Sequence, residues 1–271
     1  MQGKLIEIVR ASYGVGTRRV VIMIDVSGSM QGEAAGFGLV VVEAFVAALS
    51  AHDSLGLIVF GERIEDSLPL GSQPEAMIGT IQQLRQRRWP PSKTALFDAL
   101  AAGLALLKPP QPGDAIYLFT DGFDNSSHLT EASFDKMAER ANARIFCFVP
   151  LPAGVGNRTP ESAAGPPFLH SLSSDTGGEV VTYWFRPGEL TGVADGKVKL
   201  SNLLIGDQQT LNEATNIFAR LIDNSYQLQI HLAEPLDRPR PWKLDLVSTA
   251  GLPAKHLRLV YPKRLAVCDT Q

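Results

Sequence analysis

Three side chains with oxygen donors, Asp25, Ser27 and Ser29, directly follow an apolar run at residues 20–24. Such a run predicts a strand that is buried on both faces, as in the middle of a parallel sheet. Burying an unpaired polar group costs about 2–7 kcal/mol and an unpaired charge costs more, so these side chains need partners. Hard divalent cations bind oxygen ligands, and the spacing Asp-x-Ser-x-Ser therefore indicates one side of a metal site.

Two later segments carry donors of the same kind. Thr94 stands at the start of an apolar helical pattern, and Asp121 follows a second buried strand predicted near residues 114–120. Because the carboxyl ends of parallel strands lie at one edge of a sheet, we expect these loops to meet the Asp25 loop. Two carboxylates and three hydroxyls form an all-oxygen set that is suited to Mg²⁺.

Together, these three parts resemble the metal-ion-dependent adhesion site (MIDAS) of the von Willebrand factor A domain. The resemblance implies that Asp25, Ser27 and Ser29 are core ligands, that Thr94 is a ligand in some states, and that Asp121 binds directly or through water. It also implies that a Glu or Asp carboxylate of a protein partner completes the coordination of Mg²⁺, with Mn²⁺ or Ca²⁺ as alternative ions.

Charge arithmetic agrees with this implied partner. Mg²⁺ binds about six oxygens and usually keeps several waters, so the five side chains leave a position open. The two protein carboxylates only neutralise the cation. A third carboxylate is therefore attracted to a metal whose charge is weakly compensated.

Five neighbouring residues are expected beneath or around the site. Gly28 and Gly122 allow the backbone to turn under the ion, and Asp124 and Asn125 are expected to support the ligands or form a rim. Lys93 departs from the family pattern, which often has glycine before the threonine. A lysine there attracts an acidic ligand or competes with the cation.

Simpler explanations exist for several of these residues. Ser27 and Ser29 can be turn residues and Asp25 a helix cap. Asp98 is expected to be solvated or to cap a helix, and His128 to be a solvated loop residue. The two cysteines, Cys147 and Cys268, are expected to be unpaired thiols, since two cysteines make neither a disulfide framework nor a zinc site.

The alternation of strand and helix patterns predicts a doubly wound α/β fold with a mostly parallel central sheet. We expect strands at 5–9, 20–24, 54–60, 114–120, 143–149 and 179–185, and an antiparallel edge strand at 64–70. Helices are expected at 33–50, 74–84, 94–107, 131–141, 168–175 and 211–221, a loop at 150–167 and a hairpin tip at 194–197.

The pattern changes after residue 222. Strands are expected at 226–232, 242–247 and 256–260, with prolines in the connections between them. The order resembles a bacterial branch of the family that carries a β-extension after the A domain. We therefore expect an A domain at 17–222, and a small β-module formed by 1–16 and 223–271.

Composition narrows the class of protein. The chain has 271 residues, 45% hydrophobic and 20% charged, which is typical of a globular protein. A net charge of −3 argues against a nucleic-acid or anionic-membrane footprint. No apolar stretch reaches the roughly 18 residues that a membrane span needs. We expect a cytoplasmic protein if Met1 is the native start, and a secreted or periplasmic one if the chain has been trimmed.

Three functions are compatible with these patterns. The first is Mg²⁺-dependent binding of an acidic residue on a protein partner, without catalysis. The second is an assembly role in which the metal only braces the loops and the β-tail makes the contacts. The third is a haloacid-dehalogenase-like phosphohydrolase, which is disfavoured because Ser27 replaces the second aspartate of the usual Asp-x-Asp. We therefore expect that the protein is not an enzyme. The partner's identity and the oligomeric state stay open.

Overall fold

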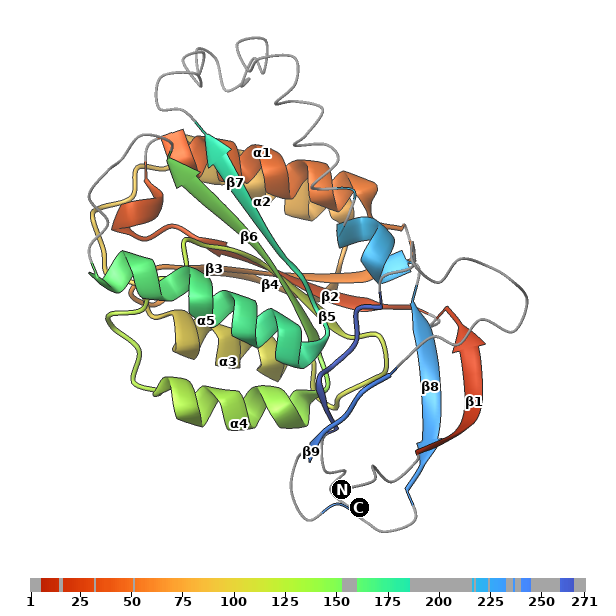
Figure 1. Ribbon diagram of the computed structural model, residues 1–271. Coiled ribbons are helices and arrows are strands. Elements are labelled where there is room, and N and C mark those ends of the chain that lie inside the picture. Colours follow the sequence, from red (N-terminus) through yellow and green to blue (C-terminus); the bar gives the residue numbers. More distant parts are fainter. Residues whose placement is uncertain are drawn as a thin grey trace.

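A six-stranded sheet with the order β4-β3-β2-β5-β6-β7 forms the centre of the molecule (Figure 1). The computed structural model describes residues 6–14, 17–31, 33–50, 52–152, 160–185, 216, 218–223, 225–232, 236, 240–244 and 259–265. Neighbouring strands are parallel except at one edge, where β4 is antiparallel to β3. The strands are β2 (Arg19–Asp25), β3 (Ser54–Phe60), β4 (Ile64–Ser72), β5 (Ala115–Phe119), β6 (Arg144–Pro152) and β7 (Val180–Phe185).

Helices cover both faces of this sheet. One face carries α1 (Glu33–Ala48) and α2 (Pro74–Gln86), and the other carries α3 (Leu96–Leu106), α4 (Glu131–Ala141) and α5 (Pro160–Thr176) (Figure 1). Successive side chains of β2 enter the two cores alternately, since Ile22 packs with the first group of helices and Met23 with the second. This two-sided burial explains the unbroken apolar run and confirms the predicted doubly wound α/β class.

The first helix approaches the sheet very closely. A Cβ atom added at Gly38 would lie 2.1 Å from the ring of Phe119, so only glycine lets α1 reach this depth over β5. On the same side, Phe45 stacks on Tyr117 at 3.9 Å between ring centroids. These contacts hold α1 against β5, whereas the parallel pairing of β5 with β2 fixes the relative position of the loops that follow both strands.

The structure corrects one predicted helix. Residues 150–167 read as a loop because of their Pro and Gly content, yet α5 already begins at Pro160 and contains Pro166 and Pro167. Proline is tolerated in the first helical turn but costs a hydrogen bond further in, which is why the sequence favoured a loop. Leu169 and Leu172 are buried against the sheet, and this tertiary packing holds the second half of the helix.

The terminal strands form two small antiparallel sheets. β1 (Glu7–Tyr13) pairs with β8 (Tyr226–His231), and β9 (Arg240–Pro241) pairs with β10 (Arg264–Leu265). The expected strand at 242–247 is wrong for residues 242–244, where Trp242 and Leu244 instead hydrogen-bond to Pro262 and Tyr261. The strand expected at 256–260 is wrong for 259–260, which are irregular.

Several other predictions lie partly or wholly outside the described residues. These are the hairpin tip at 194–197, most of the helix at 211–221 and the remaining parts of the two tail strands. Within the described part of that helix, residues 218–223 are helical, and Phe218 and Ile222 pack into the core under α1 and α2.

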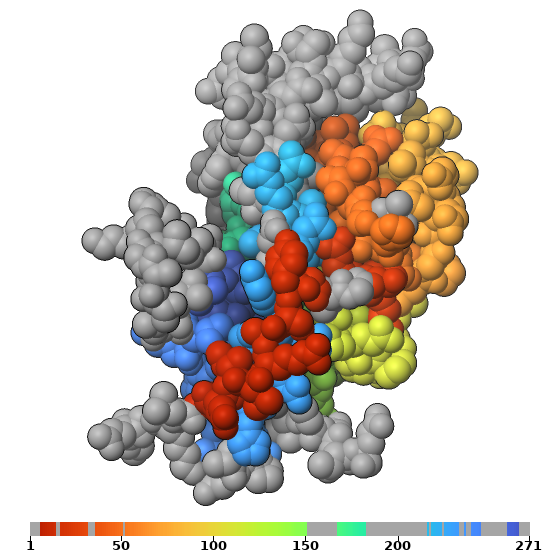
Figure 2. All heavy atoms as spheres, turned by 90° about the vertical axis from the view of Figure 1, so that its right-hand side faces the viewer, coloured from red at the N-terminus to blue at the C-terminus, as the bar shows by residue number. Residues whose placement is uncertain are grey.

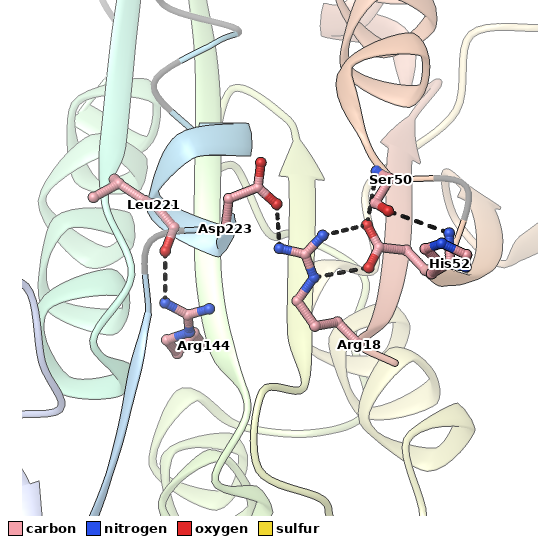
Figure 3. Close-up of polar contacts among 7 residues, drawn as sticks. Arg18, Ser50, His52, Arg144, Leu221 and Asp223 are labelled. Carbon is pink, nitrogen blue, oxygen red and sulfur yellow. Dashed lines mark hydrogen bonds and ion pairs between the residues drawn. The ribbon is translucent and has the colours of Figure 1, made fainter. Parts of the chain in front are cut away.

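The buried side chain of Arg18 links the start of β2 to the helical residues 218–223. Arg18 donates to both carboxylate oxygens of Asp53, at 2.7 Å each, and also donates to Asp223 (Figure 3). Asp53 in turn accepts from the backbone N–H of Ser50. The ion pair thus joins β2, the loop before β3 and the helical residues 218–223.

Replacing Asp53 with Asn is expected to destabilise the fold by about 3 kcal/mol, because it leaves the nearly buried Arg18 guanidinium without its bidentate partner. Urea denaturation of the metal-free protein measures this loss. Arg63→Gln is the matched control, since the Arg63 side chain is 80% exposed and its pairing with Glu65 is expected to contribute less than about 1 kcal/mol. Equal losses in the two variants would contradict the expected role of burial.

Candidate metal centre

Asp25 ends β2 as a buried carboxylate, 1% exposed. Its Oδ1 accepts from the backbone N–H of Ser27 at 2.9 Å, and its Oδ2 accepts from the Thr120 hydroxyl at 2.6 Å. Burial, followed by the nearby charge of Asp121, raises the pKa of Asp25 to about 7. The carboxylate is therefore held in place, and no described residue forms an ion pair with it.

The two serines lie on the turn that follows Asp25. Ser27 is buried and Ser29 is exposed, and their hydroxyl oxygens are 3.4 Å apart. Gly28 donates its N–H to Ser92 O at 2.9 Å, and a Cβ atom at Gly28 would lie only 3.1 Å from that oxygen. A side chain here would thus press on the loop that leads to Thr94.

Thr94 is buried between the other two loops. Its backbone N–H donates to the Asn125 side chain at 2.8 Å, and its carbonyl accepts from the N–H groups of Asn125 and Ser126, both at 3.0 Å. The next residue, Ala95, donates to Gly61 O at 2.8 Å. Thr94 is therefore fixed by the loop that carries Asp121.

The same loop caps helix α3. Ala95 occupies the N-cap position and offers no side-chain acceptor. The side chain of Asp124, from a distant segment, supplies the missing acceptor. It accepts from Leu96 N–H at 2.9 Å and from the Ser127 hydroxyl at 2.7 Å. Ser127 accepts from Phe97 N–H at 3.0 Å. Asp124 and Asn125 thus position the Thr94 loop.

Asp98, two residues after the start of α3, binds the segment that follows the Asp121 loop. It accepts from the backbone N–H groups of His128 and Leu129, both at 2.9 Å, and contacts the His128 ring. Partial burial opposes ionisation, but these hydrogen bonds outweigh it and lower the pKa of Asp98. His128 itself is exposed. Asp98 therefore fastens the far end of the Asp121 loop to α3.

Asp121 lies directly after Thr120, half-buried, and accepts from Phe123 N–H at 3.3 Å. Gly122 has a φ of +82°, a conformation that side chains rarely adopt, and it donates to the Thr120 hydroxyl at 3.0 Å. Glycine thus permits the turn beneath Asp121. Lys93, by contrast, is exposed and forms no ion pair with a described residue.

Thr120 supports the candidate site, although no sequence pattern indicated this residue. Its hydroxyl holds Asp25 while accepting from the Asp121 loop, so it links the two carboxylate-bearing segments. The register of β2 with β5 indicates that Thr120 lies beside Asp25. Ile24 lies opposite Phe119, and this register puts the next residues, Asp25 and Thr120, side by side.

Replacing Thr120 with Val is expected to weaken Mg²⁺ affinity about 10- to 100-fold, the usual cost of losing a group that orients a ligand. Titration calorimetry measures the change. Thr120→Ser is the control, because it retains the hydroxyl and is expected to bind nearly as well as the wild type. If both variants bind Mg²⁺ equally, the hydroxyl does not orient Asp25.

The donor set fits a hard cation. No group of three or more His, Cys, Asp or Glu side chains among the described residues is placed to hold a metal, so an ion here depends on hydroxyls and water. Neither Asp25 nor Asp121 forms an ion pair with a residue that the structure describes, and their mutual repulsion is part of the shift at Asp25. Such a set suits Mg²⁺ better than a softer metal.

Comparisons with known proteins agree with the fold. A family model described as the von Willebrand factor type A domain matches residues 20–123, which include all three parts of the motif. The sequence matches none of the curated proteins with which it was compared. None of the described helices is long and apolar enough to cross a membrane.

Two solved structures are similar at 17% sequence identity. The conserved hypothetical protein BatB from Bacteroides thetaiotaomicron has a TM-score of 0.50, with 75% of this chain and 99% of that chain covered. A von Willebrand factor type A protein from Catenulispora acidiphila has a TM-score of 0.52, with 79% of this chain but only 46% of that chain covered. At this identity the likeness concerns the fold. Together with the family match over residues 20–123, it shows that the chain has the fold of a von Willebrand factor type A domain.

Proposed function

We propose that the chain is an Mg²⁺-dependent protein-binding module that recognises a partner carboxylate. Asp25, Ser27, Ser29, Thr94 and Asp121 are the proposed metal ligands. The observation that carries the proposal is the pair of carboxylates Asp25 and Asp121 at the carboxyl ends of two adjacent strands. Neither forms an ion pair with a described residue, and their loops hydrogen-bond to each other.

The chain's own residues prepare this site. Thr120 and the N–H of Ser27 hold the Asp25 carboxylate, while Asn125 and Ser126 hold the Thr94 backbone. When bound, Mg²⁺ supplies positive charge and an open coordination position for an external carboxylate. Exposed Lys93 adds a positive charge beside that position and attracts an Asp or Glu side chain of the partner. Because von Willebrand factor type A domains mediate protein–protein interactions, binding is the natural use of such a site.

The proposed function involves no catalysis. A haloacid-dehalogenase-like phosphohydrolase needs a general acid/base two residues after its nucleophilic aspartate, and here Ser27 occupies that place, buried and next to the Ser29 hydroxyl. Release of phosphate from an aryl phosphate in Mg²⁺, abolished by Asp25→Asn, would overturn the non-enzymatic assignment.

Affinity capture tests the proposal. Wild type and Asp25→Ala are each used as bait in extract of the source organism, in Mg²⁺ and in EDTA. We expect one or more proteins to be captured only by wild type in Mg²⁺, and to be lost when free glutamate-rich peptide competes. Capture of the same proteins under all four conditions would contradict carboxylate recognition, and would favour assembly through the terminal strands with a metal that only braces the loops.

A further inference from the structure

A cavity of about 940 Å³ lies at the opposite end of the central sheet from the candidate metal centre. Arg144, the first residue of β6, and Asp114, just before β5, mark where the parallel strands begin. The β1–β8 sheet lies beside this end of the domain, across from α4 and α5 (Figure 1). Residues 242, 244, 259–262, 264 and 265 form a further part of the described wall.

The β1–β8 sheet turns an apolar face to this cavity. Its register puts Ile8 opposite Ile230 and Ala11 opposite Leu228, and all four residues line the cavity. Tyr13 and Tyr226 follow on the same face, with ring centroids 5.2 Å apart. The other face carries polar residues such as Glu7, Arg10, Ser12 and Gln229.

This apolar face is incompletely covered by the described residues. Ile8 is 46% exposed and Tyr226 is 67% exposed. Figure 2 shows β1 (red) on the surface of the molecule, beside β8 (blue). A two-stranded sheet is marginal without an apolar face packed against something, so this face needs a further covering group.

The helical side of the cavity is acidic. Glu131 and Asp135 on α4 and Asp175 on α5 all line it, and none forms an ion pair with a described residue, whereas Glu139 is paired with Arg264 at 2.8 Å. Partial burial and the charges of Glu131, Asp175 and Glu139 raise the pKa of Asp135, and the charge of Arg264 offsets this only in part. The acidic side chains therefore repel one another, and a cation placed among them relieves that repulsion.

Two buried hydrogen-bond donors in residues of the cavity wall have no acceptor among the described residues. Arg144 donates one guanidinium nitrogen to Leu221 O at 3.0 Å (Figure 3), while its Nη2 is buried without a partner among the described residues. Ser225 also lines the cavity, and its hydroxyl is likewise buried without a partner among the described residues. Both atoms are closed off from the cavity, so the apolar and acidic side chains alone define what the cavity can bind.

We propose that this cavity is a second docking site, which binds a partner segment with both apolar and basic side chains. The apolar side chains cover Ile8, Leu228 and Ile230. The basic side chains lie against Glu131, Asp135 and Asp175. An acidic or purely lipidic occupant satisfies only part of this surface.

The proposal is independent of the metal centre, which lies at the other end of the strands. A protein that binds at both places presents a carboxylate to one end of the domain and a basic, apolar segment to the other. Two weak contacts on one partner then act together through their effective concentration.

The test uses three fluorescein-labelled peptides of equal length, one of Leu and Lys, one of Leu and Glu, and one of Ser and Lys. Fluorescence anisotropy is measured with the full chain at physiological ionic strength, where only nearby charges act. We expect the Leu/Lys peptide to bind more tightly than the other two. Asp25→Ala is expected to bind this peptide as wild type does, which separates the result from that of the metal site.

Matched variants locate the binding surface. Asp135→Lys is expected to weaken binding of the Leu/Lys peptide about 10-fold or more, and Glu75→Lys, an exposed acid on α2 with the same change of charge, less than about 2-fold. Ile8→Gln is expected to weaken it about 5-fold, whereas Val9→Gln, 58% exposed on the same strand but not lining the cavity, leaves it unchanged. Absence of Leu/Lys binding, equal binding of the Leu/Glu peptide, or no difference between cavity and control variants would overturn the proposal.

Discussion

Replacing Asp25 with Asn is expected to abolish the stabilisation of the domain by Mg²⁺. In the wild type, saturating Mg²⁺ at about 100 times its dissociation constant adds about 2.7 kcal/mol to the free energy of unfolding. Asp25 is the only fully buried carboxylate of the proposed set and is in contact with both the Ser27 turn and Thr120. Without its charge, Asp121 alone leaves a divalent cation half neutralised.

The asparagine variant separates loss of binding from loss of fold. Its amide oxygen can accept from Ser27 N–H, and its amide nitrogen can donate to the Thr120 hydroxyl, so both contacts are kept and only the Thr120 O–H loses its acceptor. Thermal unfolding with and without Mg²⁺, together with titration calorimetry, measures the effect. Asp66→Asn, at an aspartate on the edge strand β4, is expected to keep the full Mg²⁺ response. A normal Mg²⁺ response in the Asp25 variant would mean that the ion binds elsewhere.

Sequence patterns were most informative where chemistry and burial coincide. The run before Asp25 is apolar because β2 is covered on both faces, and this burial can be recognised directly in the sequence. The position of Asp121 after β5 follows from the same logic. Both strands could therefore be predicted, and their shared edge followed from parallel topology.

The supports of the site were harder to predict because they join distant segments. Helix caps are usually sought within three residues of the helix start, whereas Asp124 caps α3 from 28 positions away. Thr120 looks like an ordinary strand residue until the register with β2 is known. The contact of Arg18 with Asp223 spans 205 positions and has no local signature.

The stability of the metal-free protein is expected to fall as the pH rises through the range 4 to 7. The Asp25 carboxyl has its ordinary pKa near 3.8 when the chain is unfolded, and burial beside Asp121 raises it to about 7 in the fold. Between these values the native state holds a proton that the unfolded state has released, so each increase in pH favours unfolding. A shift of this size corresponds to a loss of up to about 4 kcal/mol, complete above pH 7.

Denaturant unfolding of wild type and Asp25→Asn in EDTA, between pH 4 and pH 8, isolates this contribution from that of other titrating groups. The two proteins are expected to be similar near pH 4, with the variant becoming progressively more stable than wild type up to pH 7. Parallel curves for the two proteins would show that the Asp25 carboxyl is not held under strain by burial and by Asp121.

The same shift governs metal binding with the opposite sign. A divalent cation binds the ionised carboxylate, so protonation of Asp25 competes with it. With a pKa of about 7, Asp25 is mostly ionised at pH 8 but only about 3% ionised at pH 5.5, and Mg²⁺ affinity is expected to fall about 30-fold between them. An ordinary aspartate would give almost no change over that interval, so Mg²⁺ titrations at the two pH values test the buried carboxylate directly. The destabilisation of the empty site and the gain on binding are thus two consequences of one uncompensated charge.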